Sequence, residues 1–174
     1  NIDNFEHVIR GQTLVQIYDK YFTGEEEKQK EITIILYEYE RNMSFNYISG
    51  FELFIKGLRS KGIKTAVVTS SNLAKMQNVY NKHTEFKEYF DEILTSEDFA
   101  ESKPSPDCYL KAAARFGASP EECVVFEDSF NGLRSGIASG ARVIGLATTN
   151  SVAELKPYTE EIISNYDGFT LSDH

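Results

Sequence analysis

Three short polar stretches in this sequence carry residue types that could together bind a phosphate group. The first is Thr69-Ser70-Ser71-Asn72, which offers hydroxyls and an amide directly after a β-branched run. Backbone N–H groups at the start of a helix point outward and favour an anion, and hydroxyls can donate to phosphate oxygens. Taken alone, the stretch is more typical of an ordinary helix N-cap with polar neighbours.

An acid pair, Glu127-Asp128, follows a second apolar run and is itself followed by Ser129. Two adjacent carboxylates at the end of a buried strand repel each other unless a cation joins them. Mg²⁺ suits this position because it prefers oxygen ligands and keeps several of its waters. The alternative is an aspartate that caps a helix beside an exposed glutamate, and these residues leave both interpretations open.

Lys103 lies in the proline-rich stretch Ser102-Lys103-Pro104-Ser105-Pro106. The prolines stiffen the loop and restrict the backbone around the lysine. A lysine held in this way can neutralise a phosphate or a carboxylate, although most lysines are solvated surface residues. Together, the hydroxyls, the restrained lysine and the acid pair predict a phosphoryl-transfer site, because that chemistry depends mostly on positioning and charge neutralisation.

The elements that position these groups alternate between helix and strand from Phe51 onward. Strands are predicted at residues 65–69, 92–95, 123–126 and 142–146, with one more at 162–163, and the first is expected to be buried on both faces. Helices are expected between them, one from Ser105 to Gly117 and one from Asn131 to Ser139. This alternation predicts an α/β fold with a parallel sheet covered on both faces, where ligands bind beyond the carboxyl ends of the strands.

Residues 1–46 have a different pattern, which predicts helix, break and helix without a strand. Thr23 and Glu26 have the spacing of a capping box and predict the start of the second helix. We therefore expect two parts, a small helical piece over residues 1–46 and an α/β core over residues 47–174.

Composition narrows the classes of partner. The 174 residues include 18 basic and 27 acidic side chains, a net charge of −9, which argues against nucleic acid because such binders need a basic footprint. The apolar runs are far shorter than the roughly 18 residues needed to span a membrane, so no membrane partner is expected. Cys108 and Cys123 have no metal-ligand spacing and favour a reducing, cytoplasmic setting.

The ordered set of motifs resembles the haloacid dehalogenase-like (HAD) hydrolase superfamily, and within it the β-phosphoglucomutase-like branch. The resemblance covers V-V-T-S-S-N at 67–72, S-K-P-S-P-D at 102–107, V-F-E-D-S-x-x-G at 125–132 and A-S-G-A at 138–141. I-R-G-Q-T at 9–13 resembles part of that branch's helical cap. The resemblance implies a Rossmann-like core with part of a cap domain, and an Mg²⁺-dependent phosphatase or phosphomutase acting on a small phosphorylated metabolite such as a sugar phosphate.

The resemblance also implies a role for each polar residue. Thr69 would hydrogen-bond the transferring phosphoryl group, and Lys103 would bridge that group and the nucleophile. Asp128 would bind Mg²⁺, with Glu127 as a second ligand, directly or through water. Ser129 would hydrogen-bond a metal ligand. Ser70 would contribute its backbone N–H to the phosphate, and Ser71 and Asn72 would line the phosphate-binding turn.

The sequence departs from the family in its first motif, D-x-D-G-T/V, because no D-x-D occurs in the 174 residues. In the family this motif supplies the aspartate nucleophile and the general acid/base, and it ends a central strand of the sheet. We therefore expect a gap of about 9–10 Å, twice the normal strand spacing, which an N-terminal segment of the same longer protein would fill. The chain by itself is expected to be inactive.

A second departure lies in the cap, where Leu14 follows Thr13. The mutases carry an arginine at that place to hold a second phosphate, so the leucine favours a phosphatase. The missing nucleophile also leaves an alternative open, a non-catalytic phosphate-binding or regulatory module with the same fold.

Overall fold

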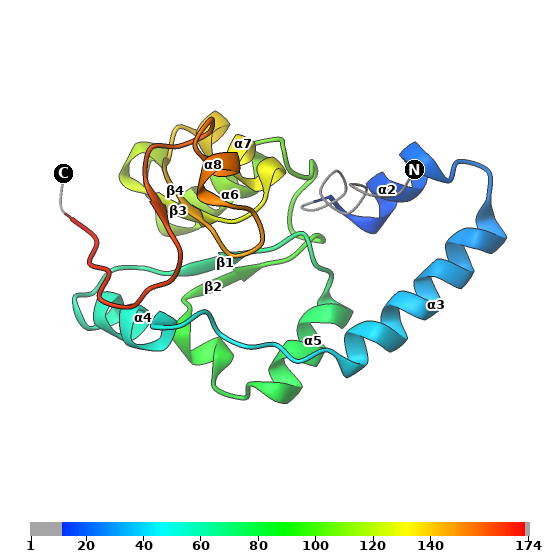
Figure 1. The fold of residues 1–174 in the computed structure, drawn as a ribbon, viewed down its shortest axis with the longest axis horizontal. Coiled ribbons are helices and arrows are strands. Elements are labelled where there is room, and N and C mark those ends of the chain that lie inside the picture. Colours follow the sequence, from blue (N-terminus) through cyan, green and yellow to red (C-terminus); the bar gives the residue numbers. More distant parts are fainter. Residues whose placement is uncertain (1–11, 173–174) are drawn as a thin grey trace.

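The computed structural model describes residues 12–172. Its first two helices, α2 (Leu14–Tyr21) and α3 (Glu26–Asn42), lie to one side of the strands (Figure 1). Neither helix contains a buried residue. At its far end α3 packs against α5 (Leu73–Lys82), which connects this helical piece to the rest of the molecule.

The capping box expected at Thr23 and Glu26 is wrong, although α3 does begin at Glu26. Its N-cap residue is Glu25, which makes no side-chain cap hydrogen bond. The Thr23 hydroxyl donates instead to the carbonyl of Asp19, because the last carbonyls of a helix lack intrahelical partners. A capping box is present one helix earlier, where Thr13 caps α2.

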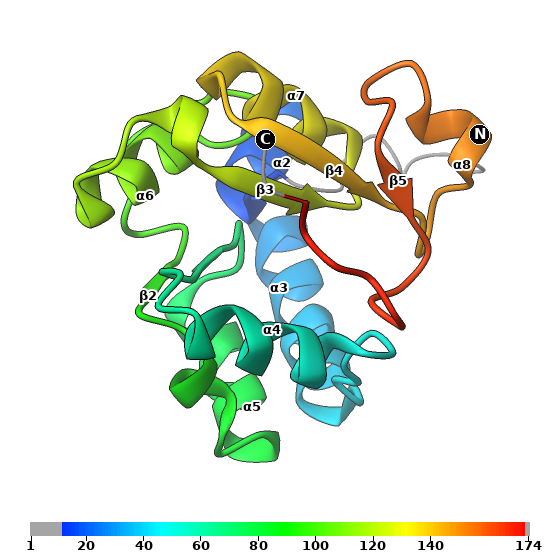
Figure 2. The ribbon, with the colours of Figure 1, turned by 90° about the vertical axis from the view of Figure 1, so that its left-hand side faces the viewer.

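The strands form two separate parallel sheets. One pairs β1 (Ala66–Val68) with β2 (Glu92–Leu94), and the other orders β3 (Val124–Glu127), β4 (Arg142–Leu146) and β5 (Ile162–Ile163) (Figure 2). Within residues 12–172, β1 and β3 each pair with a neighbour on one side only. A further strand between β1 and β3 stays a prediction.

The prediction that the first strand is buried on both faces is wrong, because all three residues of β1 are only half-buried. β3 is better covered, with Val125 and Glu127 buried. The difference follows from position, since β3 packs against α7 (Phe130–Ser139) and pairs with the longest strand. Val68, the last residue of β1, lines a cavity.

Helices cover both sheets and connect them. Those of the core are α4 (Phe51–Ser60), α5, α6 (Asp107–Phe116), α7 and α8 (Val152–Leu155), with 3₁₀ turns at Phe86–Tyr89 and Pro120–Glu122. Helix α6 contacts β1, β2 and α7 and so bridges the two sheets. It begins one residue later than the sequence predicts, because Pro106 and not Ser105 is its N-cap, and it ends at Gly117 as expected.

The apolar core lies between β3, β4 and α7, where Val125, Leu133, Val143 and Leu155 form one cluster. Gly136 allows α7 to approach this sheet, because a Cβ there would lie 2.9 Å from a Val143 methyl. Among the described residues, none of the helices combines the length and apolar character that crossing a bilayer requires.

Candidate functional site

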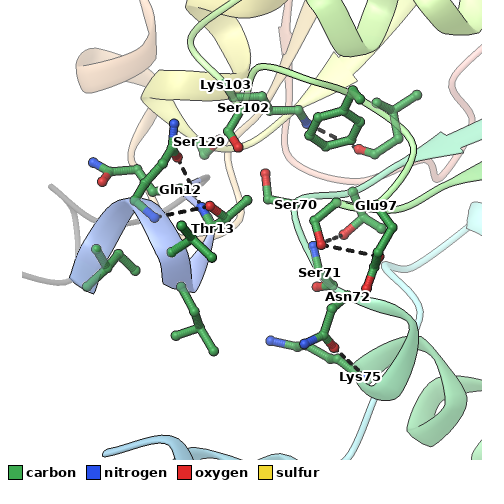
Figure 3. A pocket seen from close by; sticks show the side chains of 18 of the residues that line it. Gln12, Thr13, Ser70, Ser71, Asn72, Lys75, Glu97, Ser102, Lys103 and Ser129 are labelled. Atoms are coloured by element: carbon green, nitrogen blue, oxygen red, sulfur yellow. Dashed lines mark hydrogen bonds between the residues drawn. The ribbon is translucent and has the colours of Figure 1, made fainter. Parts of the chain in front are cut away.

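One cavity of about 1080 Å³ lies between the carboxyl ends of β1 and β3 and the two N-terminal helices (Figure 3). The structure brings every site residue predicted from the sequence to its wall. These residues are Thr69, Ser70, Ser71, Asn72, Lys103, Glu127, Asp128 and Ser129. Their convergence is a finding of the tertiary structure, whereas their chemical roles stay predictions.

The turn after β1, residues 69–72, leads directly into α5. Asn72 is the N-cap of this helix, and its Oδ1 accepts a hydrogen bond from the Lys75 N–H at 2.9 Å. The Thr69 Oγ1 accepts from the Ser71 N–H at 3.0 Å, so the turn is held by its own side chains. Capping is compatible with phosphate binding, because a helix N-terminus carries partial positive charge.

Lys103 is almost fully buried, with 4% of its surface exposed. Its Nζ donates to the Val68 carbonyl at 3.1 Å and forms an ion pair with Glu127 Oε1. Val68 ends β1 and Glu127 ends β3. The lysine therefore connects the two sheets at the point where they face the cavity.

Protein donors surround the Glu127 carboxylate. Oε1 accepts from Lys103 and from the Tyr109 hydroxyl at 2.5 Å, and Oε2 accepts from the Ser129 N–H at 3.4 Å and the Ser129 hydroxyl at 3.2 Å. Burial alone would raise the pKa of Glu127, but the Lys103 charge and these hydrogen bonds lower the pKa below its ordinary value. Glu127 is therefore held ionised inside the protein.

Gly132 completes the enclosure of Glu127, because a Cβ there would lie 2.1 Å from the carboxyl carbon. Ser129 has two roles at this point. As the N-cap of α7 it accepts from the Gly132 N–H at 3.0 Å, and its hydroxyl donates to Glu127. The start of α7 thus positions the acid pair.

Asp128 lies at the cavity wall beside the end of β4. The Thr148 hydroxyl donates to its Oδ2 at 3.4 Å, and the Asn150 amide donates to its backbone carbonyl at 2.8 Å. Asn150 is 3% exposed, and its Oδ1 is the one buried side-chain polar atom without a hydrogen-bond partner among the described residues. Asp128 is therefore anchored through its main chain by a residue from the neighbouring strand end.

Sequence reasoning missed two of these contacts. Tyr109 lies in α6, just beyond the proline-rich stretch, and reads as an ordinary apolar helix position. Burial raises the pKa of the Tyr109 hydroxyl and the charge of Glu127 raises it further. Asn150 reads as a loop residue before α8. Neither position carries a signal in the sequence, because both partners are distant along the chain.

The donor set suits Mg²⁺ in part. No group of three or more His, Cys, Asp or Glu side chains in the described part of the chain could hold a metal. The adjacent carboxylates are the oxygen ligands that Mg²⁺ prefers, and this ion commonly keeps several waters. Asp128 reaches the cavity, whereas both oxygens of Glu127 already accept hydrogen bonds. The residues therefore fit an ion whose remaining ligands are water or groups outside residues 12–172.

An ion pair joins the N-terminal helices to the core at the rim of the cavity. Lys75 Nζ of α5 lies 2.8 Å from Glu40 Oε1 of α3. Both residues line the cavity, as do Thr13 and Leu14 at the start of α2. The helical piece thus forms one wall of the cavity, opposite the turn of residues 69–72.

The chain is similar in sequence to known proteins. The sequence profile of the haloacid dehalogenase-like hydrolase family matches residues 3–146. The chain is 31% identical over 118 residues to the bifunctional riboflavin kinase/FMN phosphatase of Arabidopsis thaliana. That match covers 68% of this chain and 31% of the relative, so the chain spans about a third of the relative's length.

Solved structures agree with the sequence comparison. A HAD hydrolase of family IA, variant 3, from Entamoeba histolytica has a TM-score of 0.81 at 27% identity, covering 95% of this chain and 78% of its own. CbbY from Rhodobacter sphaeroides, solved with phosphate, has a TM-score of 0.62 at 29% identity, covering 68% and 54%. A putative β-phosphoglucomutase from Thermotoga maritima shares the fold, with a TM-score of 0.64 at 23% identity, covering 82% and 63%.

Proposed function

Because this chain belongs to the haloacid dehalogenase-like hydrolase family, we propose that it is part of an Mg²⁺-dependent enzyme that removes a phosphoryl group from a small phosphorylated metabolite. The observation that carries this proposal is the convergence of Thr69, Lys103 and Asp128 on one cavity. A hydroxyl, a buried cation and a carboxylate at strand ends supply the positioning and charge neutralisation that phosphoryl transfer requires.

Each of these groups has a distinct part in the proposal. Thr69 accepts a hydrogen bond from the turn, which leaves its own O–H to donate to a phosphoryl oxygen. Lys103 neutralises the negative charge of the same group. Asp128 would hold Mg²⁺, and Glu127 would act on the ion through water because its oxygens already have protein donors. When bound, the ion would neutralise charge on the phosphoryl oxygens.

We further propose that the nucleophile is an aspartate on a strand from outside these 174 residues. No D-x-D occurs in the sequence, and β1 and β3 belong to separate sheets whose ends Lys103 connects. A strand between them would end beside Lys103. Its carboxylate would attack phosphorus and form an acyl phosphate, while the second aspartate of the same motif protonates the departing oxygen so that it leaves as the alcohol. Water, deprotonated by that aspartate, would then hydrolyse the acyl phosphate.

Among the possible reactions we favour phosphate-ester hydrolysis over a mutase reaction. A named activity of the Arabidopsis relative is that of an FMN phosphatase, and Leu14 lines the cavity where a mutase would need a cation. Sugar phosphates remain natural substrates to test, as they are for the family. We propose a cytoplasmic setting on the ground that Cys108 and Cys123 are both free thiols.

The proposal is tested by phosphate release from a panel of phosphorylated metabolites, using protein that includes the upstream coding sequence. We expect release that EDTA abolishes and Mg²⁺ restores, with no interconversion of hexose phosphates. The 174 residues alone should show no turnover. A protein that contains an upstream D-x-D-G yet releases phosphate from no substrate would overturn the proposal.

A second candidate, a non-catalytic phosphate-binding module, is favoured by one observation, the absence of any D-x-D in the sequence. The upstream coding sequence separates the two candidates, because a D-x-D-G there supports the enzyme. Its absence, together with calorimetric binding of orthophosphate without turnover, would support the binding module.

A further inference from the structure

Tyr109 contacts both members of the buried Lys103–Glu127 pair. Its hydroxyl donates to Glu127 Oε1 at 2.5 Å, and Lys103 Nζ lies 4.8 Å from the centroid of its ring. The ring also packs against the apolar core cluster. Resting on the proposed function, we propose that Tyr109 is a positioning residue that orients the Lys103 ammonium toward the phosphoryl group.

The donors of Lys103 determine which further group it can bind. An ammonium group has three N–H donors. One donates to the Val68 carbonyl and a second to Glu127 Oε1, so one remains for a phosphoryl oxygen. The direction of the third N–H depends on how firmly the other two are held. The Tyr109 ring occupies a further side of the ammonium, which leaves the cavity as the open direction.

The hydroxyl of Tyr109 adds a second constraint through Glu127. Oε1 accepts from both Lys103 and Tyr109, whereas Oε2 is held by Ser129. Without the phenol, Lys103 is the one remaining donor to Oε1 among residues 12–172, and the ammonium can follow the carboxylate away from the substrate. Ring and hydroxyl therefore restrain the same cation from two directions.

A purely structural role for Tyr109 predicts different behaviour. The ring fills space beside the core cluster, and phenylalanine would fill that space equally well. What phenylalanine cannot supply is the hydrogen bond to Glu127. Tyr109→Phe therefore isolates the positioning role while it keeps the packing and the aromatic face toward Lys103.

The experiment compares full-length wild type with Tyr109→Phe, measuring kcat/KM for a phosphate ester with Mg²⁺ and the calorimetric affinity for orthophosphate. A lost hydrogen bond to a charged group lowers kcat/KM by about 10- to 100-fold, and orthophosphate binding should weaken by several-fold. Tyr158→Phe is the matched control, because Tyr158 packs on the same cluster and its hydroxyl instead accepts from Arg134. It should stay within about twofold of wild type.

Lys103→Arg tests whether Tyr109 acts through the lysine. Arginine keeps a cation beside Glu127 but changes the directions of its donors. In this background Tyr109→Phe should lower kcat/KM by less than about threefold, since coupled residues are not additive. If the losses in kcat/KM from the two substitutions are additive, this inference is overturned and the proposed function is unaffected. The same holds if the wild type is active and Tyr109→Phe has the same kcat/KM. A wild type that neither turns over nor binds orthophosphate would overturn the proposed function, and this inference with it.

Discussion

Lys103 and Glu127 form an ion pair in which the lysine is 4% and the glutamate 8% exposed. Removing two charges from water is costly, and the pair is tolerated because further groups satisfy its remaining donors and acceptors. Here those groups are Val68, Tyr109 and Ser129. These neighbours therefore hold the lysine in position for the proposed phosphate binding, in addition to stabilising the two buried charges.

Replacing Lys103 with methionine should destabilise the protein in a pH-dependent way. The variant leaves a buried carboxylate unpaired, which costs about 3–5 kcal/mol of unfolding free energy. In wild type the pKa of Glu127 is lowered from 4.5, so the pair's contribution is present above that pH and is lost as the pH falls below it. In Lys103→Met the effect of burial on Glu127 is no longer opposed by the lysine charge, so the pKa of Glu127 should rise.

The stability difference between wild type and Lys103→Met should therefore be largest near neutral pH and shrink in acid, as Glu127 is protonated. Urea unfolding at a series of pH values measures it. A difference that is constant with pH would contradict the role of Glu127 as the unpaired charge. Lys111→Met is the control, because Lys111 is an exposed residue of α6, and it should change the unfolding free energy by less than about 0.5 kcal/mol.

Asp128→Asn should lower turnover of the full-length enzyme by at least about 100-fold, because it removes a negative charge from the proposed Mg²⁺ ligand. Because the Asp128 side chain is only half-buried, replacing it should disturb the fold less than replacing the buried Glu127. The melting temperature of Asp128→Asn should therefore change little. Kinetics over a range of Mg²⁺ concentrations check the effect. Asp167→Asn is the control, because it changes an exposed aspartate that accepts a hydrogen bond from Ser49, and this variant should remain active. If Asp128→Asn is also active, Asp128 is not the Mg²⁺ ligand.

Helix α7 shows how an element positions the acid pair. Its N-cap Ser129 holds Glu127, and Gly132 in its first turn leaves room for the carboxylate. Gly136 lets the same helix approach β3 and β4. Small residues on one side of α7 therefore serve both the core and the site.

The two glycines Gly132 and Gly57 allow a matched test of this interpretation. A Cβ at Gly132 would meet the Glu127 carboxylate at 2.1–2.3 Å, whereas a Cβ at helical Gly57 has nothing within 4 Å. Gly132→Ala should therefore lower the unfolding free energy by about 1–3 kcal/mol through overpacking. Gly57→Ala should raise it by about 0.5–1 kcal/mol, because alanine favours helix. Urea unfolding measures the free energy of both variants. Equal effects would contradict the close approach of Gly132 to the Glu127 carboxylate.

The molecule as a whole is held together across its divided sheet by helices and by Lys103. Helix α6 contacts both sheets, and aromatic rings link α4 to the second sheet and the C-terminal segment, with Phe54 5.5 Å from Phe126 and 4.9 Å from Tyr166. Within the described residues, β1 and β3 are each an edge strand of their sheet.

A protein that includes the proposed central strand should protect β1 and β3 from hydrogen exchange. Each gains backbone hydrogen bonds on its open edge, and amides in central strands exchange only through large openings. Exchange measured on peptides over residues 66–68 and 124–127 should slow by at least about tenfold relative to the 174-residue chain. Peptides over β5, the opposite edge strand of the second sheet, serve as the control. Unchanged exchange in both β1 and β3 would contradict insertion.

Local signals predicted much of the fold correctly. The four main strands lie within a residue or two of their predicted bounds, and Gly117 and Gly140 end α6 and α7 with φ of 66° and 86°. These features depend on hydrophobic runs and on the left-handed conformation that glycine favours. The sequence also predicted that the polar residues after each strand form one site, because parallel strands bring their carboxyl ends to one edge of a sheet.

Other features depend on contacts between residues far apart in the sequence. Glu127 and Asp128 are adjacent in the sequence and both line the cavity, but packing determines that Glu127 is enclosed by Lys103 and Tyr109 while Asp128 is only half-buried. In the same way, a neighbouring helix end determines the partner of Thr23. Residue types and periodicity therefore identify which groups can take part in the chemistry. Their division into buried and accessible acids arises only when the strand ends, α6 and α7 pack together, since burial and pairing depend on all of these elements at once.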